Sequence, residues 1–545
     1  MERLNFKILA ITVLIGAFLR FSFLTSNPPS LNWDEISHGY NAYSVLKTGM
    51  DQWGEKLPIL NFRAYGDYPT ALNLYLTIPF VYFLGLSELS VRLPHAFLGV
   101  LTIISVYFLA WGVTKNRYIS LLSSFLVAVD PWNVFTSRFA LQSNLSIFLL
   151  TTSVALFVNR ELNKRFLPTS LVLLFLTLFS YHNTRIFSPI FLVGLLFIFK
   201  NEFKEIFTKL LVGIFLLTSI FILVNPSSRA RGNVLFIIDQ GAINKIENWR
   251  NDSKLPQILQ KAFYNRPTYF ALKFSRNYIQ YFAPNFLFIN GGTQYQFSVP
   301  NTGLLYMIGM PFFYIGLAFL IMRALVDKNY RVILWWLVLA PIPASLTNET
   351  YAVIRATTML PIPEILISLG FYSVLEKFGK KYVSLGITLF VIITLISLVK
   401  YLFVYFTDYK TSYSWSWQYG YKEVVNYSKD HYDEYDKIIV TKKYGEPHEF
   451  FLFFWPYDPA KYINDSEAIR FNQSNWWWVD KFDKFYFVND WQVKEMKLES
   501  GGNIDCVKSK CLLVTSPQNY PKEWSKIESI NDLDNKVIFE IYKNQ

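Results

Sequence analysis

Cysteine and histidine are scarce in this sequence. Its 545 residues include two cysteines, Cys506 and Cys511, and five scattered histidines. No two histidines have the spacing of zinc ligands, so a structural metal site is not expected. The two cysteines lie close together near the C-terminus, and this spacing allows a hairpin disulfide if that end faces an oxidising compartment.

Charged residues are also few. They make up 17% of the chain, whereas hydrophobic residues make up 52% and aromatic residues 18%. Soluble proteins of this size rarely reach such an apolar share, so the composition is that of a membrane protein. The formal net charge of +12 is typical of the lysines and arginines that anchor cytoplasmic loops. We therefore expect the lipid bilayer, and not nucleic acid, as a partner.

Long apolar segments follow one another up to about residue 406. A bilayer needs about 20 residues per helix, and most of these segments reach or approach that length. The first lacks a small-residue cleavage site, so we interpret it as a retained helix and not as a signal peptide. The segments cover roughly residues 6–24, 95–114, 118–136, 144–159, 166–181, 186–199, 207–225, 303–322, 332–346, 355–375 and 382–406.

A further apolar stretch, residues 70–86, is ambiguous because Asn73 and Pro79 interrupt it. If it lies at the interface and the N-terminus is inside, lysines or arginines occupy every inner loop, which is the positive-inside pattern. If it spans, all these basic clusters fall outside at once. We therefore predict about eleven transmembrane helices, with a cytoplasmic N-terminus and an extracytoplasmic C-terminus.

The expected fold class is an α-helical polytopic membrane protein with a small extracytoplasmic α/β domain at its C-terminal end. The membrane domain covers residues 1–406 and includes a first outer loop at 25–94 and a large outer loop at 226–302. Residues 407–545 mix charged and aromatic side chains. Four short runs in this tail predict strands at 437–441, 485–488, 512–515 and 537–541.

The strongest functional signal is the sequence Asn-Trp-Asp-Glu at residues 32–35, just after the first apolar segment. Two adjacent carboxylates are costly to keep beside a membrane boundary, which favours a functional role. The alternative is a solvated loop in which Asp34 caps a helix over residues 35–47. The residues alone leave both interpretations open.

An acidic pair in a long first outer loop resembles the motif of the GT-C membrane glycosyltransferases. The resemblance is to the protein O-mannosyltransferases and the bacterial aminoarabinose transferases of glycosyltransferase family 39. Further matching motifs follow in the same order over about the first 420 residues. They are Arg92-Leu-Pro94, Pro131-Trp132, Ser137-Arg138, the stretches at 181–186 and 340–343, and Arg355 before Pro361.

The resemblance implies an inverting enzyme whose donor is a polyprenyl-phosphate-linked monosaccharide bound in an outward-facing cavity. Asp34 then matches the family's general base on the acceptor hydroxyl, and Glu35 is its catalytic neighbour. One carboxylate suffices, because a phosphate leaving group departs as a stable anion without a general acid. Glycoside hydrolases, in contrast, need a pair. The acceptor is left open between a protein, a glycan and a glycolipid.

The charge that develops on the leaving phosphate calls for arginine, whose planar fork gives two directed hydrogen bonds. Contact with lipid headgroups is the alternative for each arginine on the predicted outer face. Arg185 and Arg355 are favoured because each sits at the mouth of a helix beside other polar residues. The donor phosphate-binding candidates are Arg63, Arg138, Arg185, Arg276 and Arg355.

Four further polar side chains are predicted to contact the substrate: His38, His182, Gln142 and Asn144. His182 either binds phosphate or satisfies a helix end, and the second interpretation is favoured. The resemblance implies an acid in the second outer loop, where this chain has the amides Gln142 and Asn144. An amide cannot act as a base or bind a cation strongly. We therefore predict no metal and no other cofactor, and the acid–base burden falls on Asp34.

Other functions stay open. A transporter or flippase of lipid-linked sugars would place charged groups near mid-membrane on broken helices, often in two related halves. Here the predicted helix interiors are nearly free of charge, which favours the enzyme. An oligosaccharide ligase or polymerase would share the membrane architecture and use a diphosphate carrier. A simple membrane anchor for the C-terminal domain would leave the ordered motifs unexplained.

Two aromatic-rich stretches complete the candidates. The large outer loop combines Arg229, Arg231 and Arg266 with several aromatic residues. This mixture suits a groove for a prenyl chain or an amphipathic helix on the membrane surface. The three tryptophans at 476–478 can contact the membrane, a partner or the core of the C-terminal domain.

Overall fold

The computed structural model of the chain describes residues 2–225, 236–474 and 476–544, so Arg229 and Arg231 lie outside the described residues. The chain divides into two compact units, each built from segments that are distant in sequence. Unit 1 comprises Met1–Arg20, Ala96–Ser137 and Leu141–Leu402, and unit 2 comprises Phe21–His95, Arg138–Ala140 and Phe403–Gln545.

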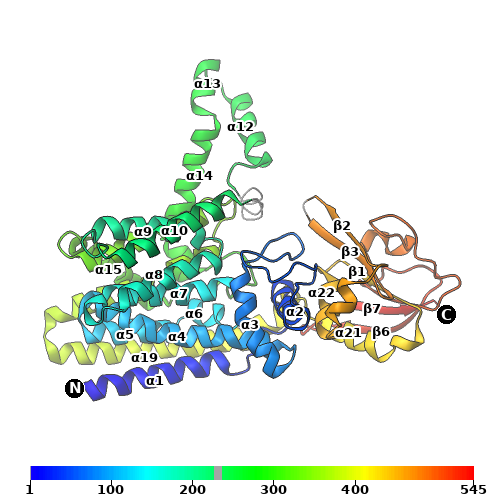
Figure 1. Cartoon of the computed structure of the whole chain (residues 1–545), viewed down its shortest axis with the longest axis horizontal. Helices are drawn as coiled ribbons and strands as arrows, with labels where there is room; N and C mark the ends of the chain where they lie inside the picture. The colour runs from blue at the N-terminus through cyan, green and yellow to red at the C-terminus, as the bar shows by residue number, and fades with distance from the viewer. Residues whose placement is uncertain (1, 226–235, 475, 545) are drawn as a thin grey trace. The chain divides into compact units, whose positions relative to one another are not determined.

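Unit 1 is built from helices (Figure 1). Some of them begin or end a few residues inside unit 2. The main helices are α1 (Glu2–Phe21), α4 (Glu88–Thr114), α5 (Arg117–Val129), α6 (Pro131–Thr136), α7 (Gln142–Val158), α8 (Phe166–Leu176), α9 (Thr184–Ile198), α10 (Ile206–Val224), α15 (Met310–Ala324), α16 (Lys328–Leu339), α17 (Ile342–Ser345), α18 (Ile362–Leu375) and α19 (Lys380–Val404).

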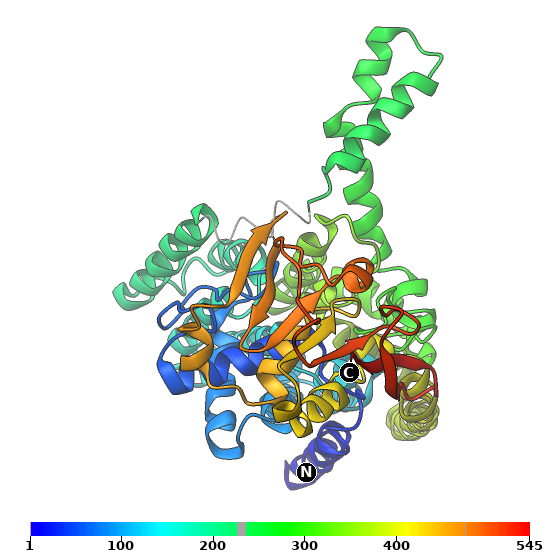
Figure 2. The ribbon, with the colours of Figure 1, turned by 90° about the vertical axis from the view of Figure 1, so that its right-hand side faces the viewer.

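Three further helices of unit 1 project away from the others (Figures 1 and 2). They are α12 (Gln240–Asp252), α13 (Gln257–Phe263) and α14 (Arg266–Gln280). Helix α14 begins where the side chain of Asn265 caps the amide of Thr268 and Pro267 occupies the first turn, which is a favoured place for proline. The predicted large outer loop is therefore helical over much of its length.

Within the part of the chain that the structure describes, four helical stretches are long and apolar enough to cross a membrane: Glu88–Thr114, Ile206–Val224, Met307–Ala324 and Tyr382–Ser412. Shorter apolar helices accompany them at Ala71–Leu84, Arg117–Val129, Gln142–Val158, Phe166–Phe179 and Thr184–Ile198. Together with the apolar composition, these helices indicate an integral membrane protein. The number of eleven crossing helices and the side on which each terminus lies stay predictions.

Glycine allows two of these helices to approach closely. A Cβ atom on Gly316 of α15 would lie 1.9 Å from the carbonyl oxygen of Leu366, and one on Gly370 of α18 would lie 2.0 Å from that of Phe312. No larger residue fits either position without moving a backbone. Small residues at helix contacts are typical of membrane proteins, where packing replaces the hydrophobic effect between helices.

Unit 2 combines helices from the first outer loop with a seven-stranded sheet near the C-terminus, whose strand order is β2-β3-β4-β1-β5-β7-β6 (Figure 2). Strand β1 is parallel to its neighbours β4 and β5, and the other pairs are antiparallel. The helices include α2 (Trp33–Thr48), α3 (Ala71–Leu84), α21 (Tyr421–Asp430) and α22 (Pro447–Phe454). The strands are β1 (Lys437–Thr441), β2 (Ile469–Gln473), β3 (Trp476–Phe482), β4 (Phe485–Val488), β5 (Cys511–Thr515), β6 (Ser525–Asn531) and β7 (Val537–Lys543).

The predicted C-terminal sheet domain is thus confirmed, and the four predicted strands correspond to β1, β4, β5 and β7. Strands β2, β3 and β6 were not predicted. Cys506 and Cys511 form a disulfide at the start of β5.

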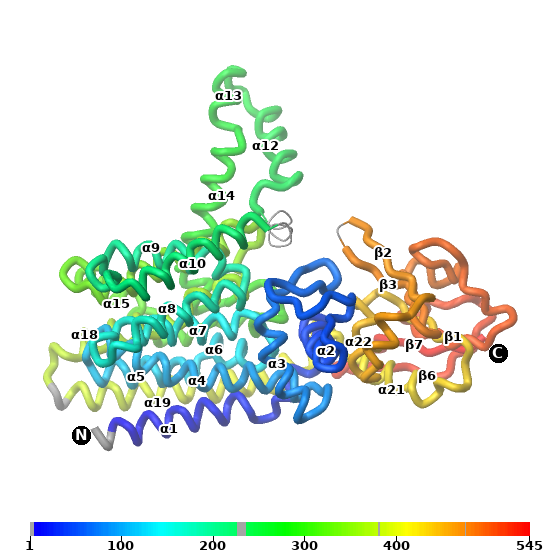
Figure 3. The backbone as a smooth tube through the Cα atoms, in the orientation of Figure 1, coloured from blue at the N-terminus to red at the C-terminus, as the bar shows by residue number. Residues whose placement is uncertain are grey.

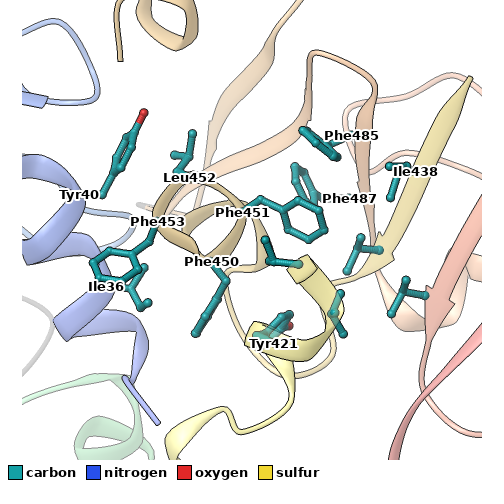
Figure 4. Packing of buried hydrophobic residues seen from close by; sticks show 14 of the residues in the cluster. Ile36, Tyr40, Tyr421, Ile438, Phe450, Phe451, Leu452, Phe453, Phe485 and Phe487 are labelled. Atoms are coloured by element: carbon teal, nitrogen blue, oxygen red, sulfur yellow. The ribbon is translucent and has the colours of Figure 1, made fainter. Parts of the chain in front are cut away.

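The core of unit 2 joins segments from both ends of the chain (Figures 3 and 4). Ile36 and Tyr40 of α2 belong to the same buried cluster as Phe450 and Phe453 of α22 and Phe485 of β4. Burying each such side chain contributes about 1.5–3 kcal/mol. This cluster fixes α2, which carries the acidic pair, on the sheet domain of the same unit.

Candidate active site

Helix α2 begins at the acidic motif. The Asn32 side chain accepts the amide hydrogen of Glu35 at 3.0 Å, and the Glu35 carboxylate accepts that of Asn32 at 3.2 Å. This reciprocal pair is a capping box. The interpretation of Asp34 as the helix cap is therefore wrong, because Asn32 holds that place and Asp34 lies within the first helical turn.

Glu35 is fully buried and has its hydrogen-bonding positions occupied. The Nε and Nη2 atoms of Arg92 both donate to its carboxylate at 2.9 Å, in the bidentate geometry that guanidinium and carboxylate favour. The backbone amide of Ala140 donates to the same group at 2.9 Å. A carboxylate held by these donors and closed to solvent fixes the structure and is poorly placed to accept a substrate proton.

Arg92 ties the first outer loop to the start of α4. Its guanidinium also donates to the carbonyl oxygens of Leu24 at 3.0 Å and Pro28 at 2.8 Å, and to that of Ser30. The side chain is fully buried. In the sequence Arg92 is identifiable only as part of a matching motif, and its pairing with Glu35 is not. Its place in the ordered motif set was the available signal.

Asp34 is only half-buried, in contrast to Glu35. Its carboxylate accepts a hydrogen bond from the Tyr65 hydroxyl. Burial and the neighbouring Asp34 carboxylate raise the pKa of Tyr65 well above its ordinary value, so the phenol remains a donor at neutral pH. Asp34 is thus oriented by a fixed donor and still partly open to solvent.

Tyr65 is held in turn by the start of β3. Its ring lies 5.2 Å from that of Trp476, centroid to centroid, and its carbonyl oxygen accepts the amide hydrogen of Trp477 at 2.9 Å. A Cβ on Gly66 would lie 1.8 Å from the Trp476 ring, so only glycine permits this approach. Two of the three consecutive tryptophans therefore pack against the loop that positions Asp34.

His38 and Arg63 also lie in this part of unit 2. The Nδ1 atom of His38 is 3.0 Å from the carbonyl oxygen of Asp34, one helical turn earlier. Burial lowers the pKa of His38 to about 4, so its ring is neutral near pH 7 and donates this hydrogen bond. The Arg63 guanidinium lies 4.3 Å from the ring centroid of Trp477. His38 therefore supports the turn that carries Asp34 and is too buried for ready contact with a substrate.

Arg138 is fully buried in unit 2. Its Nη2 atom donates to the carbonyl oxygens of Ser22 and Asn27, both at 2.8 Å, and its Nε atom donates to the Tyr405 hydroxyl at 3.3 Å. These contacts hold the chain that leads from α1 into the acidic motif. They favour a positioning role for Arg138 over phosphate binding.

The two favoured arginines, Arg185 and Arg355, lie in unit 1, and their segments meet. The Asn183 side chain donates to the carbonyl oxygen of Arg355 at 2.7 Å. Arg185 lies 3.3 Å from the Nδ1 atom of His182, and Arg355 pairs with the Glu349 carboxylate at 2.8 Å. The structure thus gathers three of the predicted phosphate or substrate ligands at one place in unit 1.

The remaining candidates of unit 1 lie on α7 and α14. Gln142 begins α7, and the Asn144 amide donates to the carbonyl oxygen of Thr136 at 2.7 Å, closing the turn before that helix. Arg276 is exposed on α14, beyond the turn at which that helix starts.

Unit 1 also contains a carboxylate pair that our sequence interpretation missed. The Asn133 amide donates to Asp130 at 2.9 Å and to Glu364 at 2.7 Å, and all three side chains are buried. Arg20 is fully buried in the same unit and donates to the carbonyl oxygens of Val127 and Ala128. The signal available was a charged residue within a predicted apolar helix, which is costly and therefore informative.

In the described ranges 2–225, 236–474 and 476–544, no group of three or more histidine, cysteine, aspartate or glutamate side chains is arranged to hold a metal ion.

Comparisons with known proteins agree with the resemblance inferred from the motifs. Residues 10–223 match the family model of dolichyl-phosphate-mannose-protein mannosyltransferases. ArnT from Cupriavidus metallidurans, solved with undecaprenyl phosphate, shares the fold with a TM-score of 0.53 and 10% identity, over 100% of this chain and 98% of that one. The similarity to GT-C membrane glycosyltransferases is therefore confirmed.

A second solved structure is less similar. The oligosaccharyltransferase of Archaeoglobus fulgidus has a TM-score of 0.49 and 14% identity, with 83% of this chain covered. The match spans 63% of that protein's length, which is less than two thirds. No curated protein sequence matches the chain significantly.

Proposed function

We propose that the protein is an inverting glycosyltransferase that moves a monosaccharide from a polyprenyl-phosphate donor to an acceptor hydroxyl on the outer face of the membrane. The observation that carries this proposal is the difference between two adjacent carboxylates. Glu35 is buried and paired with Arg92, whereas Asp34 is half-buried and held by the Tyr65 hydroxyl. One carboxylate shapes the site, and the other is available for chemistry.

Asp34 then acts as the general base. The acceptor hydroxyl attacks the anomeric carbon, its proton passes to the Asp34 carboxylate, and the bond from the anomeric carbon to the phosphate oxygen breaks. A single displacement inverts the configuration. The lipid phosphate departs as an anion, so the reaction needs no general acid and no metal.

The donor phosphate is assigned to the arginine group of unit 1. Arg185 and Arg355 lie on segments that contact each other, and His182 is within reach of the Arg185 guanidinium. Arginine forks suit the oxygens of a phosphate. The structure of ArnT with undecaprenyl phosphate supports this class of donor for a protein of the same fold. In this proposal the N-terminus is cytoplasmic, and unit 2 carries its sheet on the outer side.

Substitution of Asp34 tests the proposal. Purified protein in nanodiscs is incubated with a panel of polyprenyl-phosphate sugars and with peptide, glycan and glycolipid acceptors, and release of the lipid phosphate is measured. Asp34→Asn should lower kcat by about 10²–10⁴-fold, the usual contribution of a general base, and leave the melting temperature unchanged. Glu55→Gln, which changes an exposed carboxylate in the same predicted outer loop, is the matched control and should retain activity.

Retention of wild-type kcat by Asp34→Asn would remove Asp34 as the base. A panel that includes diphosphate-linked oligosaccharides also separates the proposed enzyme from a ligase or polymerase.

A flippase of lipid-linked sugars is the second candidate, because the ionisable side chains of Asp130, Glu364 and Arg20 are buried among the helices of unit 1. Such groups often mark transport pathways. In vesicles, a flippase would move a fluorescent lipid-linked sugar between leaflets without releasing its phosphate, and that result would favour this candidate over the transferase.

A further inference from the structure

Unit 2 contains a cavity of about 480 Å³ beside the β2–β3 hairpin. Its volume falls within the range of about 300–1,000 Å³ that small-molecule sites occupy. Most of its lining comes from β3 and from the short helix η10 (Asp490–Glu495) with the residues around it. The side chains that matter for its chemistry are Trp476, Trp478, Trp491, Gln473, Asn489 and Glu499.

Three tryptophans form the apolar part of this cavity. Trp476 and Trp478 are two residues apart on β3 and so project from the same face of the strand, with ring centroids 6.0 Å apart. Trp491 on η10 is 76% exposed. Three indoles that line one cavity, one of them this exposed, mark a binding surface more often than a single exposed residue does.

Amides and one carboxylate form the polar part. The Asn489 amide donates to Glu499 at 2.7 Å, and the Gln473 amide donates to the other Glu499 oxygen at 3.3 Å. Among the described residues that line the cavity, none is cationic. Lys442 lies 5.2 Å from the ring centroid of Trp478, but it is buried and paired with the Asp480 carboxylate. The cavity therefore disfavours a phosphate or another anion.

We propose that this cavity binds a neutral saccharide. The C–H groups on a sugar ring carry partial positive charge and match the negative face of an indole ring. Sugar hydroxyls both donate and accept, as the amides of Gln473 and Asn489 and the carboxylate of Glu499 require. A purely aliphatic ligand would offer these polar groups no hydrogen bonds. A lipid phosphate would be repelled by the Glu499 carboxylate and would find no cation among the described lining residues.

Side-chain contacts through Trp476 and Tyr65 link the lining of the cavity to the candidate base, Asp34. Trp476 lines it, packs its ring 5.2 Å from that of Tyr65, and donates its Nε1 hydrogen to Glu446 at 2.6 Å. Tyr65 donates to Asp34. If Asp34 is the base, which rests on the proposed function, the saccharide in this cavity belongs to the acceptor and not to the donor.

Binding is tested on the full chain in nanodiscs by saturation-transfer NMR and calorimetry. The probes are neutral α- and β-linked trisaccharides of hexose and of N-acetylhexosamine. At least one should bind, and Trp491→Ala should weaken it about tenfold or more, as removal of a central aromatic contact does. Trp491→Phe should recover part of the affinity. Trp415→Ala, which removes another exposed tryptophan of unit 2, is the matched control and should bind as the wild type does.

Three results would overturn the proposal: no binding of any trisaccharide, equal affinity in Trp491→Ala, or binding only of a serine- and threonine-rich peptide or of anionic vesicles. The outcome is separable from the fate of the catalytic proposal, because Asp34→Asn should bind the trisaccharide normally. Saccharide binding by a protein that never releases lipid phosphate would keep the cavity assignment and contradict the transferase. Transfer by a protein that binds no trisaccharide would keep the transferase proposal and contradict the cavity assignment.

Discussion

Two carboxylate pairs of this protein differ in how their members are held. They are Asp34 with Glu35 in unit 2 and Asp130 with Glu364 in unit 1. In unit 2 the members are neighbours in sequence but have different surroundings, since an arginine neutralises one and a tyrosine orients the other. In unit 1 the members are far apart in sequence but share one buried amide donor, Asn133.

The difference shows that adjacency in sequence says little about how carboxylates divide their roles. What separates Asp34 from Glu35 is burial and the identity of the donors around each. Asp130 and Glu364, in contrast, share a buried amide donor, the Asn133 side chain. Both carboxyl groups are buried, so each depends in part on the amide that donates to it.

Loss of Arg92 should have the largest effect on the stability of unit 2. Arg92→Met would leave the buried Glu35 charge without its partner, which costs about 3–5 kcal/mol in comparable sites. We expect a large fall in the melting temperature and loss of folded protein during purification. Arg63→Met is the matched control, because the Arg63 guanidinium lies over the tryptophan rings of Trp53 and Trp477. Equal melting temperatures for both variants would show that the Glu35 pair is not structural.

Acid should reveal the burial of His38. Burial lowers the pKa of His38 to about 4 in the folded chain. In the unfolded chain the imidazole is protonated below about pH 6.5, whereas in the folded chain it is protonated only below about pH 4. Stability therefore rises with pH across this window, and about 3 kcal/mol is lost as the pH falls through it. The wild type should lose about 5–10 °C more in melting temperature than His38→Asn between pH 7 and pH 4.5.

His431→Asn is the control for this experiment, since His431 makes the same contact with a carbonyl oxygen one turn earlier, at 2.9 Å, and is less buried. An acid response that is the same in His38→Asn and in the wild type would contradict the assignment.

Removal of the amide in unit 1 should have the smallest of these effects. Asn133→Ala takes a donor from both Asp130 and Glu364 and should cost about 1–3 kcal/mol, the penalty for buried groups left without a partner. Thr136→Val, on the same helix, removes only a hydroxyl that bonds the preceding turn and should change stability less. Thermal unfolding in detergent compares the two. A neutral Asn133→Ala would mean that the carboxyl groups do not depend on the amide.

The strands that sequence patterns predicted are four neighbours in the sheet, β4, β1, β5 and β7. β1, β4 and β5 are rich in buried β-branched and aromatic residues, and this pattern identifies them. The interior strand β3 and the two edge strands, β2 and β6, were not predicted. The edge strands have a physical reason. They carry charged residues such as Arg470, Lys526 and Glu528, as edge strands must to avoid pairing with other chains, and this hides the strand pattern.

The acidic motif was identifiable from the sequence, but the division between its two carboxylates was not. The partners of Glu35 come from residues 92 and 140, and the donor to Asp34 from residue 65. No local pattern relates these positions, because they meet only through the packing of unit 2. For the same reason the sequence could not indicate that Trp476 belongs to a cavity and also supports Tyr65.

The hydrogen-bond donors to Glu35 come from distant parts of the chain, and this determines when the site can form during synthesis. Glu35 takes its hydrogen bonds from Asn32, Arg92 and Ala140, and Tyr65 takes its packing partner from residue 476. During synthesis from the N-terminus, the acidic motif leaves the ribosome first and its partners follow. A ribosome must therefore translate most of the chain before Asp34 has its complete surroundings, so truncated products lack an assembled site.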